Sequence, residues 1–255
     1  MRGARLAAAV AVLGVLAGCN SGGSTVPPPS PALGQAVDIP IESSIAHLPL
    51  TKPDGTTTSL AAYRGRPVMI ADFMTLCTDI CPLISANTAA LGRAIAADGY
   101  GGKVALLEIT MDPERDTLAR IRAYRKLYGP PLADWTLLRA SPTDTRRIWH
   151  YFGVELQRVK EKTPPDIDWW THKPLTYDIE HSDALVFLDG AGHERFVVDA
   201  APNTENHSPP AELARFLGKQ GRQLLHHPDP VITWTVSQGL SVFSWLLNQH
   251  LNVPT

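Results

Sequence analysis

Apolar runs alternate with amphipathic stretches over most of the chain, a pattern typical of an α/β protein. Two apolar runs, Val68–Phe73 and 104–109, predict buried strands. The stretches 82–97 and 117–128 place apolar side chains at helical spacing and each ends near glycine, so both predict helices. A hairpin is expected ahead of the first buried strand, around the turn signal Asp54-Gly55.

The pattern continues with a short strand, a helix and a closing unit of strands and a helix. Trp135–Leu138 predicts the strand. Ser141 and Pro142 then open a helix to about residue 152, because serine caps a helix and proline is tolerated in its first turn. The runs 184–188 and 194–198 flank a turn and predict antiparallel strands, and 208–225 predicts the last helix.

Two parts of the chain fall outside this alternation. Residues 154–179 show no clear period and contain Trp169-Trp170, so we interpret them as an insertion or a long hairpin. The two tryptophans form a partner-docking surface or pack on the domain. The tail, residues 226–255, is rich in apolar side chains and predicts a helix packed on the domain, with a membrane surface as the alternative.

The first residues predict a targeting segment and not a part of the fold. Arg2 and Arg5 precede an apolar run, residues 6–15, that is too short to span a bilayer core of about 30 Å. Leu16-Ala17-Gly18-Cys19 then resembles a bacterial lipobox, in which Cys19 carries lipid; an uncleaved anchor or an ordinary secretory signal is the alternative. We therefore expect a lipoprotein signal peptide over 1–18, a flexible Ser/Gly/Pro tether over 19–38, a domain over 39–225 and an extension over 226–255.

The net charge, the lipobox and the cysteine count limit which partners and which cell compartment fit the chain. The net charge of −2 shows no basic excess, which argues against nucleic acid as a partner. The lipobox indicates a cell-membrane location, lipid-anchored and facing the extracytoplasmic side. If Cys19 carries lipid, the domain holds Cys77 and Cys81, which form a disulfide in an oxidising compartment unless metal or a reductant keeps them apart. The sequence lacks the further nearby ligand pair that structural zinc requires.

Cys77 and Cys81 lie between the first buried strand and a helix that begins at or just before Pro82. This places Cys81 at a helix N-terminus, where partial positive charge favours a thiolate and can lower a thiol pKa from about 8.5 to between roughly 3.5 and 7.5. Two such sulfurs suit Cu(I) binding, disulfide exchange or both. A cysteine pair at this point of the strand order also indicates a thioredoxin-like α/β fold, with a central mixed sheet flanked by helices, an N-terminal hairpin and a C-terminal helical extension.

Three segments in order carry a family pattern. Residues 77–82 read C-x-x-x-C-P, residues 112–117 read D-P-E-R-D-T, and His181-Ser182 precedes an apolar strand and an Asp-Gly turn. Together they resemble the Sco/SenC family of copper-binding assembly factors, which are thioredoxin-like proteins. The resemblance covers residues 45–217, with Glu180 standing where the family commonly has aspartate.

The resemblance implies that Cys77, Cys81 and His181 bind copper, as Cu(I) or Cu(II). By itself His181 would be interpreted as a strand-end histidine bonded to backbone. For 112–116 we prefer helix capping and a local ion pair, in which Asp116 or Glu114 bonds with Arg115, to a catalytic role. The expected function is a copper metallochaperone for the binuclear copper centre of a respiratory oxidase, whose copper-accepting subunit is the partner.

Two other functions stay open. One is a thiol–disulfide reductase that keeps oxidase cysteines reduced, with Cys77 and Cys81 as the catalytic pair. The other is a copper or redox sensor that acts through protein binding. The cysteine spacing, one longer than C-x-x-C, and the absence of proline at 180–182 favour copper over the reductase. No catalytic base is visible, so the chain is not assigned as an enzyme. For His226-His227 we prefer solvated side chains to the alternative, a second metal site.

Overall fold

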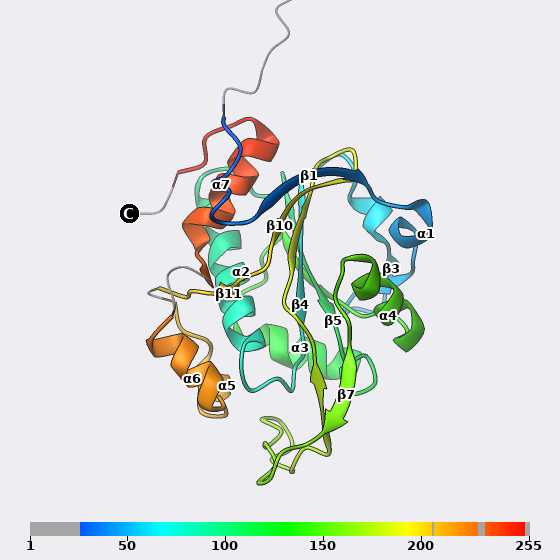
Figure 1. Cartoon of the computed structure of the whole chain (residues 1–255), viewed down its shortest axis with the longest axis vertical. Helices are drawn as coiled ribbons and strands as arrows, with labels where there is room; N and C mark the ends of the chain where they lie inside the picture. The colour runs from blue at the N-terminus through cyan, green and yellow to red at the C-terminus, as the bar shows by residue number, and fades with distance from the viewer. Residues whose placement is uncertain (1–25, 206, 229–232, 253–255) are drawn as a thin grey trace, which may run out of the picture.

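The computed structural model describes residues 26–205, 207–228 and 233–252, and its centre is a mixed sheet with strand order β1-β10-β9-β4-β5-β6 (Figure 1). β4, β5 and β6 are parallel, and β9, β10 and β1 are added antiparallel on the other side of β4. The strands are β1 (Gln35–Pro40), β4 (Val68–Phe73), β5 (Ala105–Thr110), β6 (Trp135–Leu138), β9 (Leu185–Leu188) and β10 (His193–Val198).

Helices cover both faces of the sheet. In Figure 1, α2 and α7 lie on one side of the sheet and α1 and α4 on the other. The helices are α1 (Ser43–Ala46), α2 (Cys81–Ala97), α3 (Leu118–Leu127), α4 (Pro142–Tyr151), α5 (Ala211–Ala214), α6 (Lys219–His226) and α7 (Val236–Leu247), with a 3-10 turn at Leu60–Tyr63. This arrangement confirms the predicted α/β fold with a central mixed sheet.

The inner strands lie where the apolar runs predicted them. β4 and β5 are buried at every position, as expected for parallel strands covered on both faces, and pair in register from Val68 with Ala105 to Phe73 with Thr110. The caps of the neighbouring helices also match the sequence signals, because Thr117 accepts a hydrogen bond from the Arg120 amide and Ser141 from the Asp144 amide. The register places the carboxyl ends of β4 and β5, and the loops after them, side by side.

In the part of the chain that the structure describes, three short pairs of strands lie outside the central sheet. β2 (Leu50–Thr51) and β3 (Thr57–Thr58) form the predicted N-terminal hairpin. β7 (Gln157–Lys160) and β8 (Tyr177–Glu180) are antiparallel, so residues 154–179 form the long hairpin that was one of the two interpretations. β11 (Ala201–Pro202) and β12 (Thr233–Trp234) pair in parallel.

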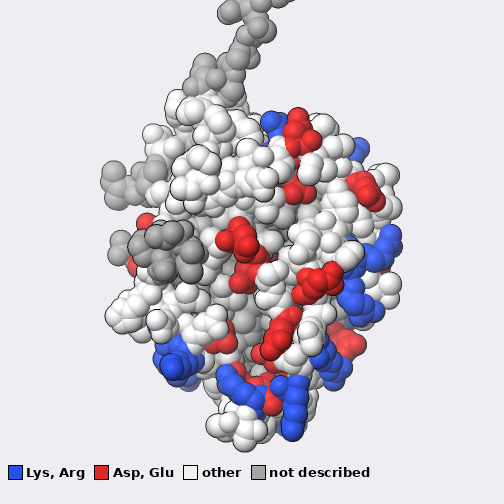
Figure 2. Space-filling model, viewed as in Figure 1, with Lys and Arg blue, Asp and Glu red and all other residues white. Residues whose placement is uncertain are grey.

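On the face shown in Figure 2, acidic and basic side chains are interspersed, so this face carries mixed charge.

The tether prediction is wrong for part of its range. β1 begins at Gln35 and pairs with β10, and both Val26 and Leu33 are buried. Ahead of β1, the Val26 amide donates to Asn248 Oδ1 just after the last helix, so this segment is in contact with the domain. Residues 1–25, which include the predicted signal peptide and Cys19, lie outside the described residues.

The end of the chain also differs from the pattern-based expectation. The helix expected over 208–225 is two helices, α5 and α6, separated at residues 215–218. The break lets the Gly218 amide donate to the Thr78 carbonyl, which ties the chain to the loop between the cysteines. α7 then packs on α2 with Val242 and Phe243 fully buried, so the predicted packing of the tail on the domain is confirmed. Within the described residues, no helix combines the length and apolarity needed to cross a membrane.

Candidate metal centre

The two cysteines lie on the loop that follows β4 and on the first turn of α2. β4 ends at Phe73 and α2 begins at Cys81, with proline next in its first turn. The Cys81 amide donates to the Cys77 sulfur at 3.4 Å, so Cys77 occupies the end of the helix where unpaired N–H groups point. Both thiols are free; Cys77 is half-buried and Cys81 is fully buried.

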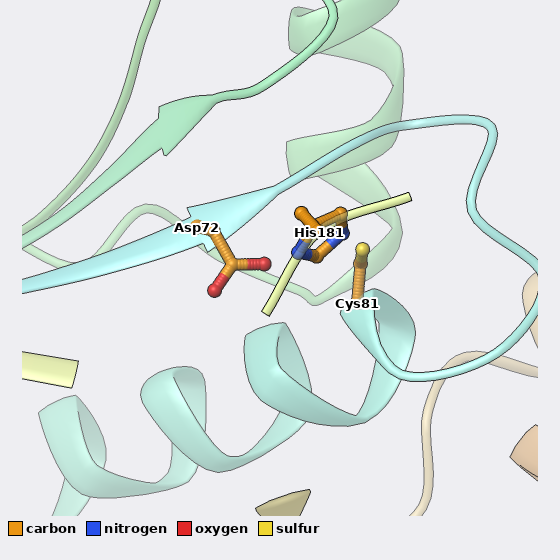
Figure 3. Close-up of side chains that lie close together, drawn as sticks. All are labelled: Asp72, Cys81 and His181. Atoms are coloured by element: carbon orange, nitrogen blue, oxygen red, sulfur yellow. The ribbon is translucent and has the colours of Figure 1, made fainter. Parts of the chain in front are cut away.

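His181 reaches the same place from the segment after β8, which lies outside the central sheet. It follows β8 directly, and its side chain is only 6% exposed. Donor atoms of Asp72, Cys81 and His181 all lie within 4.8 Å of one another, and Figure 3 shows the imidazole beside both the carboxylate and the sulfur. Three elements therefore converge here: the end of β4, the start of α2 and the segment after β8.

The structure brings together some of the predicted ligands and adds another residue. Cys81 and His181 belong to the converging group, whereas the Cys77 sulfur lies outside it among the described residues. Cys77 stays next to the group through its contact with the Cys81 amide. Asp72 stands in the group although the sequence assigned it no role. Its signal was a carboxylate inside the otherwise apolar run Val68–Phe73, where a buried charge is costly without a partner.

Burial of the Cys81 side chain opposes the thiolate that a helix N-terminus favours. Removal from water raises the pKa of the Cys81 thiol well above its usual value, and the nearby Cys77 and Asp72 raise it further. The expectation of a thiolate favoured by the helix N-terminus is therefore wrong for the metal-free chain. Because a thiolate is the ligand form, a metal that binds here must displace the Cys81 proton.

Two carboxylates with raised pKa values flank the histidine. Burial raises the pKa of Asp72 to about 7, with a further contribution from the negative charge of Asp183 and an opposing one from His181. Burial likewise raises the pKa of Asp183. His181 Nδ1 lies 3.2 Å from the Ser182 carbonyl oxygen and 3.7 Å from Asp183 Oδ1. Such partners fix the ring orientation of a ligand histidine.

Residues 112–117 contact the loop between β4 and α2 that carries Cys77. Asp116 is fully buried and accepts hydrogen bonds from the amide and hydroxyl of Thr75 and from the hydroxyl of Thr110. Arg115 pairs with Asp112, and its guanidinium donates to the Tyr177 carbonyl at 2.7 Å. The ion pair therefore forms with Asp112, not with Glu114 or Asp116, and Asp116 is free to anchor the loop directly.

The remaining candidates lie around the site. Trp169 packs beside Tyr124 and donates its indole N–H to the Thr75 carbonyl at 2.7 Å, whereas Trp170 is 43% exposed. One tryptophan thus packs on the domain and the other faces solvent. His226 and His227 are exposed at the end of α6 and belong to no group of metal-ligating side chains found among the described residues.

The fold and the site together define a class of protein: a thioredoxin-like domain in which a Cys-x-x-x-Cys loop lies beside a histidine. The SCO1/SenC family model matches residues 42–216. The chain belongs to the SCO1/SenC family. A SCO1 protein homologue from Bacillus subtilis is 26% identical over 168 residues, which cover 65% of this chain and 83% of the relative.

Solved structures of the same family resemble the chain in fold. ScoI of Bradyrhizobium japonicum with copper bound is 25% identical, over 67% of this chain and 97% of that one, with a TM-score of 0.49. A Sco protein with a disulfide switch is described as a member of the Sco family of cytochrome c oxidase assembly proteins. It is 17% identical, over 68% of this chain and 89% of that one, with a TM-score of 0.50. A SCO1/SenC family lipoprotein from Bacillus anthracis is 16% identical, over 72% of this chain and 92% of that one, with a TM-score of 0.50.

Proposed function

We propose that this chain is an extracytoplasmic copper metallochaperone that holds copper with Cys77, Cys81 and His181. The observation that carries the proposal is the convergence of Cys81 and His181, from distant parts of the chain, next to a second thiol. Thiolate sulfur suits Cu(I), and imidazole nitrogen suits copper in either oxidation state. The residues present therefore fit copper as the cargo.

The unequal exposure of the two thiols suits a metal that is passed on. Cys81 and His181 are almost inaccessible, whereas Cys77 is half-buried. An incoming thiol of a partner can replace Cys77 first while the two buried ligands still hold the ion. Copper then leaves by stepwise ligand exchange and is never free in solution.

The family and the N-terminal sequence support proposals for the recipient of the copper and for the membrane anchor. We infer delivery to the copper-accepting subunit of a respiratory oxidase, supported by membership of a family in which a related protein is described as a cytochrome c oxidase assembly protein. We infer attachment to the outer side of the cell membrane through lipid on Cys19, supported by the lipobox pattern and by a family lipoprotein in Bacillus anthracis.

A second function, thiol–disulfide reduction, is favoured by the same difference in exposure. The accessible Cys77 would attack a target disulfide as a thiolate and release one target thiol. Cys81 would then attack the mixed disulfide, which releases the second target thiol and leaves Cys77 and Cys81 oxidised. The net change is one disulfide exchanged for another, with two electrons passing from the chain to the target.

A transfer assay distinguishes the two functions. The reduced chain, loaded with Cu(I), is mixed with a two-thiol copper-binding peptide, and separately the metal-free chain is mixed with the same peptide as a disulfide. Chaperone function predicts that copper moves to the reduced peptide while both cysteines of the chain stay reduced. Failure to bind copper, together with rapid reduction of the peptide disulfide and oxidation of Cys77 and Cys81, would contradict it.

A further inference from the structure

A buried carboxylate faces the proposed copper ligands. Asp72 is 1% exposed and lies near the end of β4, with its side chain directed toward His181 and Cys81 (Figure 3). A donor atom of Asp72 is within 4.8 Å of donor atoms of both residues. Its Oδ2 has no hydrogen-bond partner among the described residues. Buried polar atoms are almost always paired, so an unpaired carboxylate oxygen at this place indicates a missing ligand.

Two other buried acids nearby, Asp116 and Glu108, accept hydrogen bonds from hydroxyl groups, although Glu108 Oε1 has no partner among the described residues. Asp116 accepts hydrogen bonds from two threonines, and Glu108 accepts one from the Ser85 hydroxyl at 2.7 Å. Neither belongs to the group of donor atoms around Cys81. Asp72 differs because its carboxylate is placed among sulfur and nitrogen donors.

We propose that Asp72 is an oxygen ligand of this metal centre, used when the site holds Cu(II) and dispensable when it holds Cu(I). This inference rests on the proposed function. Cu(I) is soft and is satisfied by two thiolates and an imidazole. Cu(II) favours tetragonal sites with nitrogen and oxygen donors, so a carboxylate at the fourth position stabilises the oxidised ion selectively.

This role makes Asp72 a determinant of oxidation-state preference. Selective stabilisation of Cu(II) lowers the reduction potential of the bound ion, since reduction then loses a ligand interaction. Removing the carboxylate should weaken Cu(II) binding and leave Cu(I) binding nearly unchanged. Each tenfold loss of Cu(II) affinity at constant Cu(I) affinity raises the potential by about 59 mV.

The test compares the full-length wild-type chain with Asp72→Asn and Asp72→Leu, and with Glu108→Gln as a matched control. Leucine suits a position inside an apolar strand, so Asp72→Leu keeps the fold while it removes the oxygen donor. Cu(I) and Cu(II) affinities are measured by chelator competition, the Cu(II) environment by electron paramagnetic resonance, and the potential by redox titration.

We expect both Asp72 variants to lose at least about tenfold in Cu(II) affinity, with Cu(I) affinity within about twofold of wild type. Their Cu(II) spectra should change, and Glu108→Gln should match wild type throughout. Unchanged Cu(II) affinity and spectra overturn the inference, as does an equal loss of both affinities, which would mean that Asp72 only shapes the loop. Wild-type chain that binds neither ion would instead overturn the proposed function, and this inference with it.

Discussion

The buried acidic side chains near the candidate metal centre differ in the hydrogen bonds that compensate their charge. Glu108 lies on β5, fully buried beneath α2, and its Oε1 has no hydrogen-bond partner among the described residues. Burial raises the pKa of Glu108 to about 8, although the Ser85 hydroxyl opposes the shift. Glu108 is therefore mostly protonated in the folded chain at neutral pH, and this proton links stability to pH.

Glu108→Gln should remove part of the pH dependence of unfolding. Between about pH 4.5, where an unfolded glutamate loses its proton, and about pH 8, only the folded chain binds this proton. Wild-type stability relative to the glutamine variant should therefore fall as pH rises through this window, by at most about 1.4 kcal/mol per pH unit, and level off above it. Denaturant unfolding of both proteins from pH 5 to 9 measures the difference, and parallel stability curves would refute the assignment.

At the scale of elements, the loop that carries the cysteines, residues 74–80, is held by two other segments. Asp116, in the segment after β5, anchors Thr75, which precedes Cys77. The second segment, α6, contacts the loop through Gly218, whose amide donates to the Thr78 carbonyl at 2.7 Å, and Gly221, whose amide donates to Asp79 at 3.2 Å. α6 follows the residues matched by the family model, which end at 216. The cysteine loop of this chain is thus braced by an element outside the matched region.

Gly221→Ala tests this brace. In an open helix the change would stabilise the chain by roughly 0.5–1 kcal/mol, because alanine loses less entropy than glycine. Here a Cβ would lie 2.7 Å from the Asp79 carbonyl oxygen and 2.9 Å from that of Thr78, both backbone atoms. We expect a net loss of about 1–3 kcal/mol in the free energy of unfolding and faster amide exchange in the loop.

The matched control for this change is Gln220→Ala, an exposed position on the same helix. It should leave the free energy of unfolding within about 0.5 kcal/mol of wild type. If Gly221→Ala is as stable as this control or more stable, α6 does not brace the loop.

At the scale of the whole molecule, the sequence predicted the elements better than their long-range contacts. Strands such as β4 and β6 have the predicted bounds, because buried apolar runs and turn signals are local. The contact between Gly221 and Asp79 joins residues 142 positions apart, and no local sequence pattern predicts it. The edge strand β1 was missed for a similar reason: its exposed positions resemble a linker, and only pairing with β10 makes it a strand.

The candidate metal centre was predictable only in part. Cys77, Cys81 and His181 came from a motif resemblance, and the structure places Cys81 beside His181 across a large sequence separation. The burial that keeps the Cys81 thiol protonated could not be inferred, because the helix-end effect is local and burial depends on the packed fold. Asp72 carried a visible signal as a charged residue in an apolar strand, but its position beside the histidine required the three-dimensional fold.

Copper stoichiometry of the reduced full-length chain, wild type against His181→Ala, tests the central claim most directly. His47→Ala serves as control, because His47 is exposed and bonds only with Ser43 among the described side chains. We predict a single copper ion per chain for wild type and control, and a loss of at least about tenfold in affinity for His181→Ala with both thiols still titratable. If His181→Ala binds copper as tightly as wild type, His181 is structural and the cysteines are better explained as a redox pair.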